Sequence, residues 1–162
     1  MHLTIEELLQ YTEEERALWE VWFKENGEEL LKMPVVGERE NTIGALILDI
    51  FGPEWRFVRR LEGEPDGEFR NRPRYHIDEL FGFGLESRNR MRTFIAQAEE
   101  QDWKRTLEFE ISSRIVRASI RKVVFSVLIH EIRNWAQVSR LMRERGFVPP
   151  VNQDLLTSSA LV

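Results

Sequence analysis

Four long segments of the chain carry apolar residues at spacings of three and four, and this periodicity limits the possible folds more than any other feature. The segments are 4–31, 41–63, 77–100 and 119–146, and the spacing predicts an amphipathic helix over each. Between the last two, residues 105–119 break the period, and alternating apolar residues there predict an extended connection or a short strand. The expected fold is all-α: a four-helix bundle with a long crossover and a short extended segment before the last long helix.

Residues typical of helix ends support these boundaries. Thr4 followed by Glu7 forms a candidate capping box at the start of the first segment. Asp78 is a candidate cap for the third helix and Ser119 for the fourth. Gly146, followed by two prolines, should end the fourth helix. The four helices therefore have plausible sequence-encoded limits.

The second segment contains a proline and an acid in unusual places. Asn41 or Thr42 can cap its start, and Pro53 should kink the helix or restart it near Gly52. Asp49 stands between the apolar runs "ALIL" and "IF". A carboxylate inside an apolar segment is costly unless it is paired or bound to something. Asp49 is therefore a candidate functional residue.

Composition excludes several classes of site. The 162 residues suit one domain, 1–162, and contain no cysteine, which excludes disulfides, thiolate zinc sites and cysteine nucleophiles. The stretch "MHLTIEELLQ" lacks the pattern of a signal peptide, and no run of apolar residues is long enough to span a membrane. We therefore expect a cytoplasmic protein that does not interact with membranes.

The charge balance argues against bulk nucleic-acid binding. The formal net charge is −5, which disfavours association with a polyanion. However, 19 of the 23 basic residues are arginines, and some cluster in residues 69–75 and 87–92. These clusters are either solvated faces with surface ion pairs or a site for a phosphate or another anion.

In the fourth segment, three polar residues continue a stripe of apolar residues at helical spacing. The stripe consists of Val123, Val127, His130, Asn134, Gln137 and Leu141. Two His one turn apart commonly hold a metal ion, but the second position here is Asn134. The zinc-protease pattern His-Glu-x-x-His also needs a second His, but in "HEIRN" that position is Asn134, so one zinc ligand is missing. Asp49, His130 and Asn134 therefore form either a metal site or an ion-free hydrogen-bond network. We find no nucleophile elbow and no glycine-rich phosphate loop.

Two stretches resemble the DinB/YfiT-like family of damage-inducible helical-bundle proteins. Residues 128–150, "LIHEIRNWAQVSRLMRERGFVPP", resemble the last core helix of that family. Residues 42–63, "TIGALILDIFGPEWRFVRRLEG", resemble its second helix. The most specific parts are "HEIRNWAQ", "LMRERG" and "GPEWRF". The resemblance covers most of the chain and implies a four-helix bundle that is often dimeric.

The resemblance also implies a metal site that is altered in this chain. The family holds a divalent ion with three His, and the corresponding residues here are Asp49, His130 and Asn134. Asp is an acceptable ligand, whereas an amide oxygen is a weak one for zinc or nickel. The ion would be Zn, Ni, Mn or Fe, or there would be none. Glu54 and Gln137 are candidates to support the ligands.

Two functions follow from the resemblance. The first is a stress-related DinB-like bundle with a degenerate Asp-His-Asn triad that binds metal weakly or not at all. The alternative is a metal-dependent thiol transferase or hydrolase that uses a divalent ion held by these three residues. A homodimer is expected, with a small-molecule ligand or a thiol as a further partner. The 5 Trp and 10 Phe belong either to an apolar interface or to the core.

Overall fold

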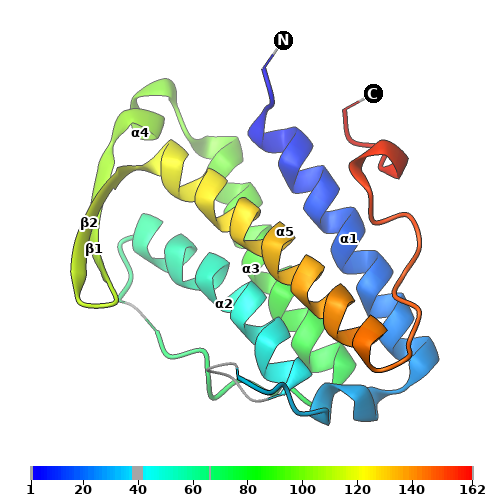
Figure 1. Cartoon of the computed structure of the whole chain (residues 1–162). Coiled ribbons are helices and arrows are strands. Elements are labelled where there is room, and N and C mark those ends of the chain that lie inside the picture. Colours follow the sequence, from blue (N-terminus) through cyan, green and yellow to red (C-terminus); the bar gives the residue numbers. More distant parts are fainter. Residues whose placement is uncertain (1, 38–41, 66, 162) are drawn as a thin grey trace.

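The computed structural model describes residues 2–37, 42–65 and 67–161. These residues form five α-helices, two short 3-10 helices and one two-stranded sheet, so the predicted mostly helical fold is confirmed. The long helices are α1 (Ile5–Asn26), α2 (Ile43–Leu61), α3 (Ile77–Gln97) and α5 (Ile120–Glu144). Figure 1 shows them side by side, with the C-terminal segment running back along α1.

The remaining elements are short. The 3-10 helices are η1 (Glu28–Lys32) and η2 (Leu155–Thr157), and α4 is Glu100–Lys104. The strands β1 (Thr106–Ile111) and β2 (Arg114–Ser119) pair antiparallel and lead directly into α5. The hairpin stands at one side of the helices, next to the start of α5 (Figure 1).

The hairpin is more than the single extended segment that the sequence predicts. The apolar alternation correctly marks β1, but the second strand was not predicted. Its turn is formed by Ser112 and Ser113, which have φ angles of 48° and 63°. These angles are those of a type I′ turn, which needs positive φ at both positions and for which Asn-Gly is the usual sequence signal. A Ser-Ser turn gives no such signal, so the pairing escaped prediction.

The core is rich in aromatic side chains. Trp19 of α1 stacks on Trp135 of α5, with ring centroids 5.5 Å apart. Trp22 and Trp55 are also buried, while Trp103 is partly exposed. Most of the tryptophans therefore stabilise the core and are not available to an interface. No helix in the described parts of the chain has the length and apolar character needed to cross a membrane.

Most predicted helix ends are confirmed, and one is wrong. The capping box of Thr4 is present, and Ser119 accepts a hydrogen bond from the first turn of α5. Asp78, however, is not a cap, because α3 begins one residue earlier and its N-cap position is His76. Asp78 lies within the first turn, where its charge is still favourable to the helix dipole.

The helix α2 runs without interruption through Pro53, so the predicted restart near Gly52 is wrong. Thr42 caps this helix, and the other candidate, Asn41, lies outside the described residues. A Cβ atom on Gly52 would lie only 2.1 Å from the ring of Phe69. The glycine therefore allows the segment between α2 and α3 to pack directly on α2.

Candidate functional site

The polar residues predicted to face the core lie at its edge. His130, Asn134 and Gln137 are partly exposed. The centre of the buried face of α5 is formed instead by Glu131 and Trp135, which are 1% and 0% exposed. The predicted inward stripe is thus displaced by about one residue around the helix. This rotation moves His130 to the wall of a surface cavity.

His130 contacts the backbone of α2 and not the carboxylate of Asp49. Its Nε2 atom lies 3.2 Å from the carbonyl oxygen of Asp49. Pro53 has no N–H group, so this carbonyl, four residues earlier, lacks its usual helical donor. The imidazole supplies the missing donor if Nε2 carries the proton. This hydrogen bond explains how α2 continues through the proline.

Asn134 is bonded to its own helix. Its Nδ2 atom donates to the carbonyl oxygen of His130 at 2.7 Å. The same atom lies 3.2 Å from both ring nitrogens of His130. One nitrogen cannot lie along two diverging lone pairs, so these approaches are packing contacts and the carbonyl is the real acceptor. The amide nitrogen of Asn134 is therefore held by the preceding turn of its own helix.

The carboxylate of Asp49 points toward another partner. Its side chain is 37% exposed, and Oδ1 lies 3.9 Å from Nη2 of Arg70. Over the described ranges, no three His, Asp or Glu side chains are close enough together to hold a metal ion. The predicted triad thus shares one region of the surface, with the imidazole of His130 on the backbone carbonyl of Asp49 and the carboxylate of Asp49 facing Arg70.

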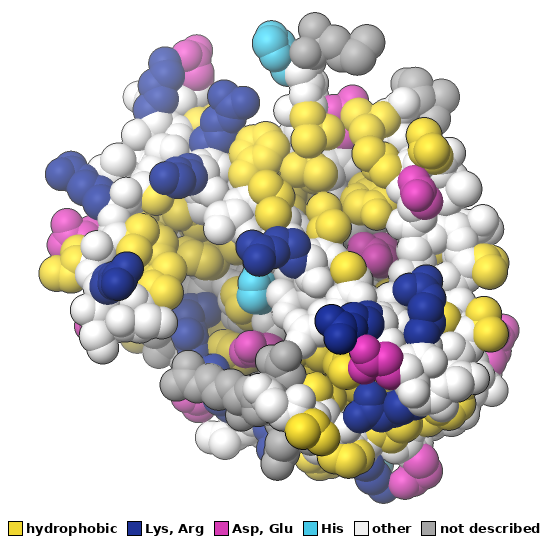
Figure 2. All heavy atoms as spheres, in the orientation of Figure 1, with side chains coloured by type: hydrophobic (Ala, Val, Ile, Leu, Met, Phe, Trp, Pro, Cys, Tyr) yellow, Lys and Arg dark blue, Asp and Glu magenta, His cyan; other side chains and the backbone are white. Residues whose placement is uncertain are grey.

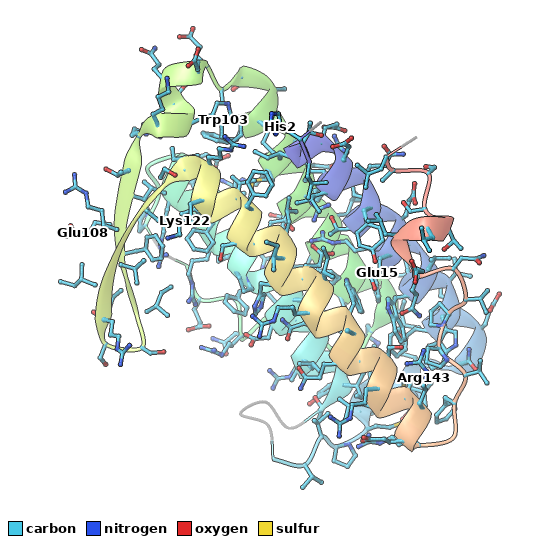
Figure 3. All side chains as sticks on the ribbon, turned by 45° about the horizontal axis from the view of Figure 1, so that its top comes forward. His2, Glu15, Trp103, Glu108, Lys122 and Arg143 are labelled. Carbon is cyan, nitrogen blue, oxygen red and sulfur yellow. The ribbon has the colours of Figure 1, made fainter. Side chains whose placement is uncertain are left out.

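Asp49 and His130 do line one cavity, of about 490 Å³. Its walls come from α2, α5, the hairpin and the segment before α3. The basic side chains in the wall are those of Arg56, Arg60, Arg70 and Lys122, and the acidic ones are those of Asp49 and Glu110. Figure 2 shows basic and hydrophobic side chains together around the hollow beside the hairpin. Lys122 lies at the start of α5, next to the strands (Figure 3).

Aromatic rings support the arginines of this cavity. The guanidinium of Arg56 lies over Phe69 at 4.9 Å from the ring centroid. Arg60 lies over Phe57 at 5.4 Å and over Phe109 of β1 at 5.0 Å. Such stacking orients a cation without neutralising its charge. The cavity therefore combines fixed positive charge with flat apolar surfaces.

Two of the cations retain binding capacity. Among the described residues, the buried Nε of Arg56 has no hydrogen-bond partner. Lys122 likewise forms none of the ion pairs found within the described ranges, although it lines the cavity. A buried donor without a partner is unfavourable unless something binds it. Arg56 and Lys122 therefore leave positive charge in the wall of the cavity without an acidic partner among the described residues.

A second polar cluster lies inside the helical core. It consists of Arg16, Glu54, Arg88 and Glu131, one from each long helix, and we call it the core ion network. Arg88 Nε lies 2.7 Å from Glu54 Oε1, and Arg88 Nη2 lies 2.8 Å from Glu131 Oε2. Arg16 Nε lies 2.6 Å from Glu131 Oε1, and Arg16 also pairs with Glu54. The two cations and two anions balance each other.

The remaining donors of the core ion network are also satisfied. Arg16 donates to the carbonyl of Gly84, and Arg88 donates to the hydroxyl of Thr12. Burial alone would raise the pKa of Glu54, but Arg16 and Arg88 outweigh it and hold the pKa below its usual value. Glu54 therefore stays ionised and structural, and it does not support a metal ligand.

Comparisons with known proteins do not identify a family. The chain was scanned against protein-family models, and none matches. A search of curated proteins also gave no match. The likeness to the DinB/YfiT-like family therefore stays a prediction.

Proposed function

We propose that this chain is a four-helix bundle of the DinB/YfiT-like kind whose surface cavity binds a small organic anion without a catalytic metal ion. The observation that carries the proposal is the excess of basic over acidic side chains in the wall of the cavity, four against two. The protein as a whole is acidic, with a net charge of −5. A locally positive cavity on an acidic protein attracts anions selectively.

The shape and lining of the cavity support a ligand with a flat apolar body. A volume of about 490 Å³ suits a small molecule. Phe57, Phe69 and Phe109 line it, and three arginines, Arg56, Arg60 and Arg70, lie over their rings. A carboxylate or phosphate would bind Arg56 and Lys122, while an aromatic body would pack on the rings. An aromatic carboxylate is the simplest compound with both properties.

Binding of benzoate by isothermal titration calorimetry tests the proposal. We expect benzoate to bind the wild-type protein and benzamide, its neutral analogue, to bind at least tenfold more weakly. Arg56→Met and Lys122→Met should each weaken benzoate binding about tenfold, a loss of about 1.4 kcal/mol. Arg140→Met is the control, because Arg140 is an exposed α5 residue that pairs with Glu144 outside the cavity. Equal affinity for benzoate and benzamide would contradict an anion site.

The alternative is a metal-dependent thiol transferase or hydrolase at Asp49, His130 and Asn134. Both Asp49 and His130 line the cavity, which favours this alternative over an enzyme elsewhere. However, His130 would have to release the carbonyl of Asp49, and Asp49 would have to leave Arg70. Elemental analysis of untagged, chelator-free protein tests it. About one metal ion per chain, lost in Asp49→Ala and His130→Ala, would overturn the metal-free proposal.

Homodimerisation and a stress-related role are proposed from the resemblance alone. The aromatic content no longer supports an interface, because four of the five tryptophans are buried in the core. Light scattering coupled to size-exclusion chromatography measures the oligomeric state. A mass close to that of one 19.3 kDa chain at all accessible concentrations would remove the dimer from the proposal.

A further inference from the structure

A second cavity lies on the other side of α5, under the C-terminal segment. Its volume is about 790 Å³, and it is walled by α1, α5 and residues 148–157. The apolar part of its lining includes Ile132, Ala136, Val148 and Pro149. It shares no lining residue with the cavity that contains Arg56. Any ligand here would therefore bind independently of the proposed anion site.

Hydrogen bonds to α1 hold the outer wall of this cavity in place. Nε1 of Trp22 donates to the carbonyl of Val148 at 2.7 Å. The hydroxyl of Tyr11 donates to the carbonyl of Gln153 at 2.8 Å. Further along, Ser158 donates to the carboxylate of Glu14 at 2.6 Å. The C-terminal segment is therefore a fixed wall, and the space beneath it is part of the fold.

Glu15 is the unusual residue in the lining. It is only 5% exposed, and within the described residues its buried Oε2 atom has no hydrogen-bond partner. The nearest cation along the helix, Arg16, is already paired with Glu54 and Glu131. Since the core ion network is electrically balanced without Glu15, this carboxyl group has no counter-ion among the residues that the structure describes.

The groups around Glu15 keep its carboxyl group neutral. Burial, and then repulsion from Glu131, raise the pKa of Glu15 to about 8. The other charged or titratable groups of this cavity are Tyr11, Arg143 and Asp154. Arg143 is exposed and lies near the C-terminal end of α5, well away from Glu15 (Figure 3). Glu15 thus holds a proton at neutral pH in the wall of the cavity.

We infer that this cavity is a binding site for a small organic ammonium ion with an apolar body, and that Glu15 is its counter-ion. On binding, the O–H bond of the Glu15 carboxyl group breaks and its proton passes to solvent, leaving a carboxylate beside the ammonium group. The ion pair gives Oε2 the partner that it lacks. Ile132, Ala136 and Val148 provide apolar surface for the body of the ligand.

Benzylammonium is a suitable probe, with benzyl alcohol as its neutral analogue. We expect saturable binding of benzylammonium at pH 7, measured by calorimetry in two buffers of different ionisation enthalpy. The difference between the buffers should correspond to the release of about one proton per ligand. At pH 8.5 this release should fall well below one proton, because most of Glu15 is then ionised before the ligand arrives. Benzyl alcohol should bind at least tenfold more weakly, with no proton release.

Glu15→Gln tests the assigned residue. The change is nearly isosteric with a neutral carboxyl group, so the fold should persist, which circular dichroism checks. We expect at least a tenfold loss of benzylammonium affinity and no proton release. Glu25→Gln, an exposed position on the same helix, should leave both unchanged. The inference is overturned if benzyl alcohol binds as tightly as benzylammonium, if wild-type binding does not saturate, or if Glu15→Gln binds equally well. The benzoate experiment tests the proposed anion site at Arg56 separately, so the two proposals can fail independently.

Discussion

The core ion network and the cavity that contains His130 both contain arginine and acidic side chains, but these side chains are paired to different extents. In the core ion network, each of Arg16, Glu54, Arg88 and Glu131 has charged partners on other helices. In the cavity, Arg56 and Lys122 have no acidic partner among the described residues. Complete pairing indicates a structural role, whereas unneutralised positive charge in the wall of a cavity can attract an anion. Burial of charge alone therefore does not mark a functional site.

The core ion network is better explained by specificity than by net stability. Removing two ion pairs from water costs about as much as their attraction returns, so replacing the whole set by apolar residues is often neutral. However, one member comes from each long helix, and the short distances fix the register of all four. We expect the network to select one helix arrangement among several that bury similar apolar area.

The largest expected effect comes from removing one member of the core ion network. Arg88→Met leaves Glu54 and Glu131 to share Arg16 alone, and an uncompensated buried charge costs about 3–5 kcal/mol. Urea unfolding followed by circular dichroism measures the loss. Arg140→Met, at an exposed pair on α5, should change stability by less than ~0.5 kcal/mol. Similar losses for both variants would erase the distinction between buried and exposed arginines.

A smaller effect concerns pH and Glu15, which lies beside the network but outside its pairing. The pKa of Glu15 is raised from 4.5 to about 8, so between these values the folded state keeps a proton that the unfolded state loses. Stability should therefore fall as pH rises through this window, by about 1.4 kcal/mol per pH unit. Unfolding curves at pH 6, 7 and 8 measure the slope. Glu15→Gln should flatten it, and an equally steep slope in that variant would show that other groups cause it.

In the cavity that contains His130, the contribution of the His130 hydrogen bond to the free energy of unfolding should depend on Pro53. His130→Ala leaves the carbonyl of Asp49 without a donor and should cost about 1 kcal/mol. In a Pro53→Ala background the helix supplies its own N–H group, so the same change should cost clearly less. A double-mutant cycle of unfolding free energies measures this coupling. Additive effects would mean that the imidazole does not compensate for the proline.

The smallest expected effect on stability is that of Asp49→Asn. Its carboxylate is 37% exposed and only 3.9 Å from Arg70, so the unfolding free energy should change by less than ~0.5 kcal/mol. The change removes one of the two acids of the cavity, and benzoate should consequently bind severalfold more tightly. Weaker benzoate binding would indicate that Asp49 positions Arg70 for the ligand. A large loss of stability would contradict a surface role for Asp49.

Much of the fold could be predicted from local patterns. The periodicity located the four long helices, and Thr4 and Ser119 marked two helix starts correctly. These features depend on residues close in sequence, whose interactions do not need the rest of the chain. The second strand could not be predicted, because the Ser112–Ser113 turn adopts positive φ angles without the residues that usually favour them.

The site was harder to predict, because two adjacent stripes of α5 have helical spacing. Val124, Leu128, Glu131, Trp135, Val138 and Met142 also recur at intervals of three and four, and this stripe faces the core. It contains an acid, Glu131, at a position where the sequence alone shows no partner. Glu131 can be buried only because Arg16 and Arg88, which lie on other helices, pair with its carboxylate. Sequence spacing alone cannot reveal partners so far apart.

The same long-range pairing bears on how the chain acquires its fold. Arg16 and Glu131 are 115 residues apart, and Arg16 and Glu54 are 38 apart. Because synthesis proceeds from the N-terminus, α1 leaves the ribosome long before α5 exists to neutralise its buried guanidinium. A half-made chain would expose the apolar surface of Trp19, which is buried in the finished fold. We therefore expect the helices to pack together in one late event after α5 has been made.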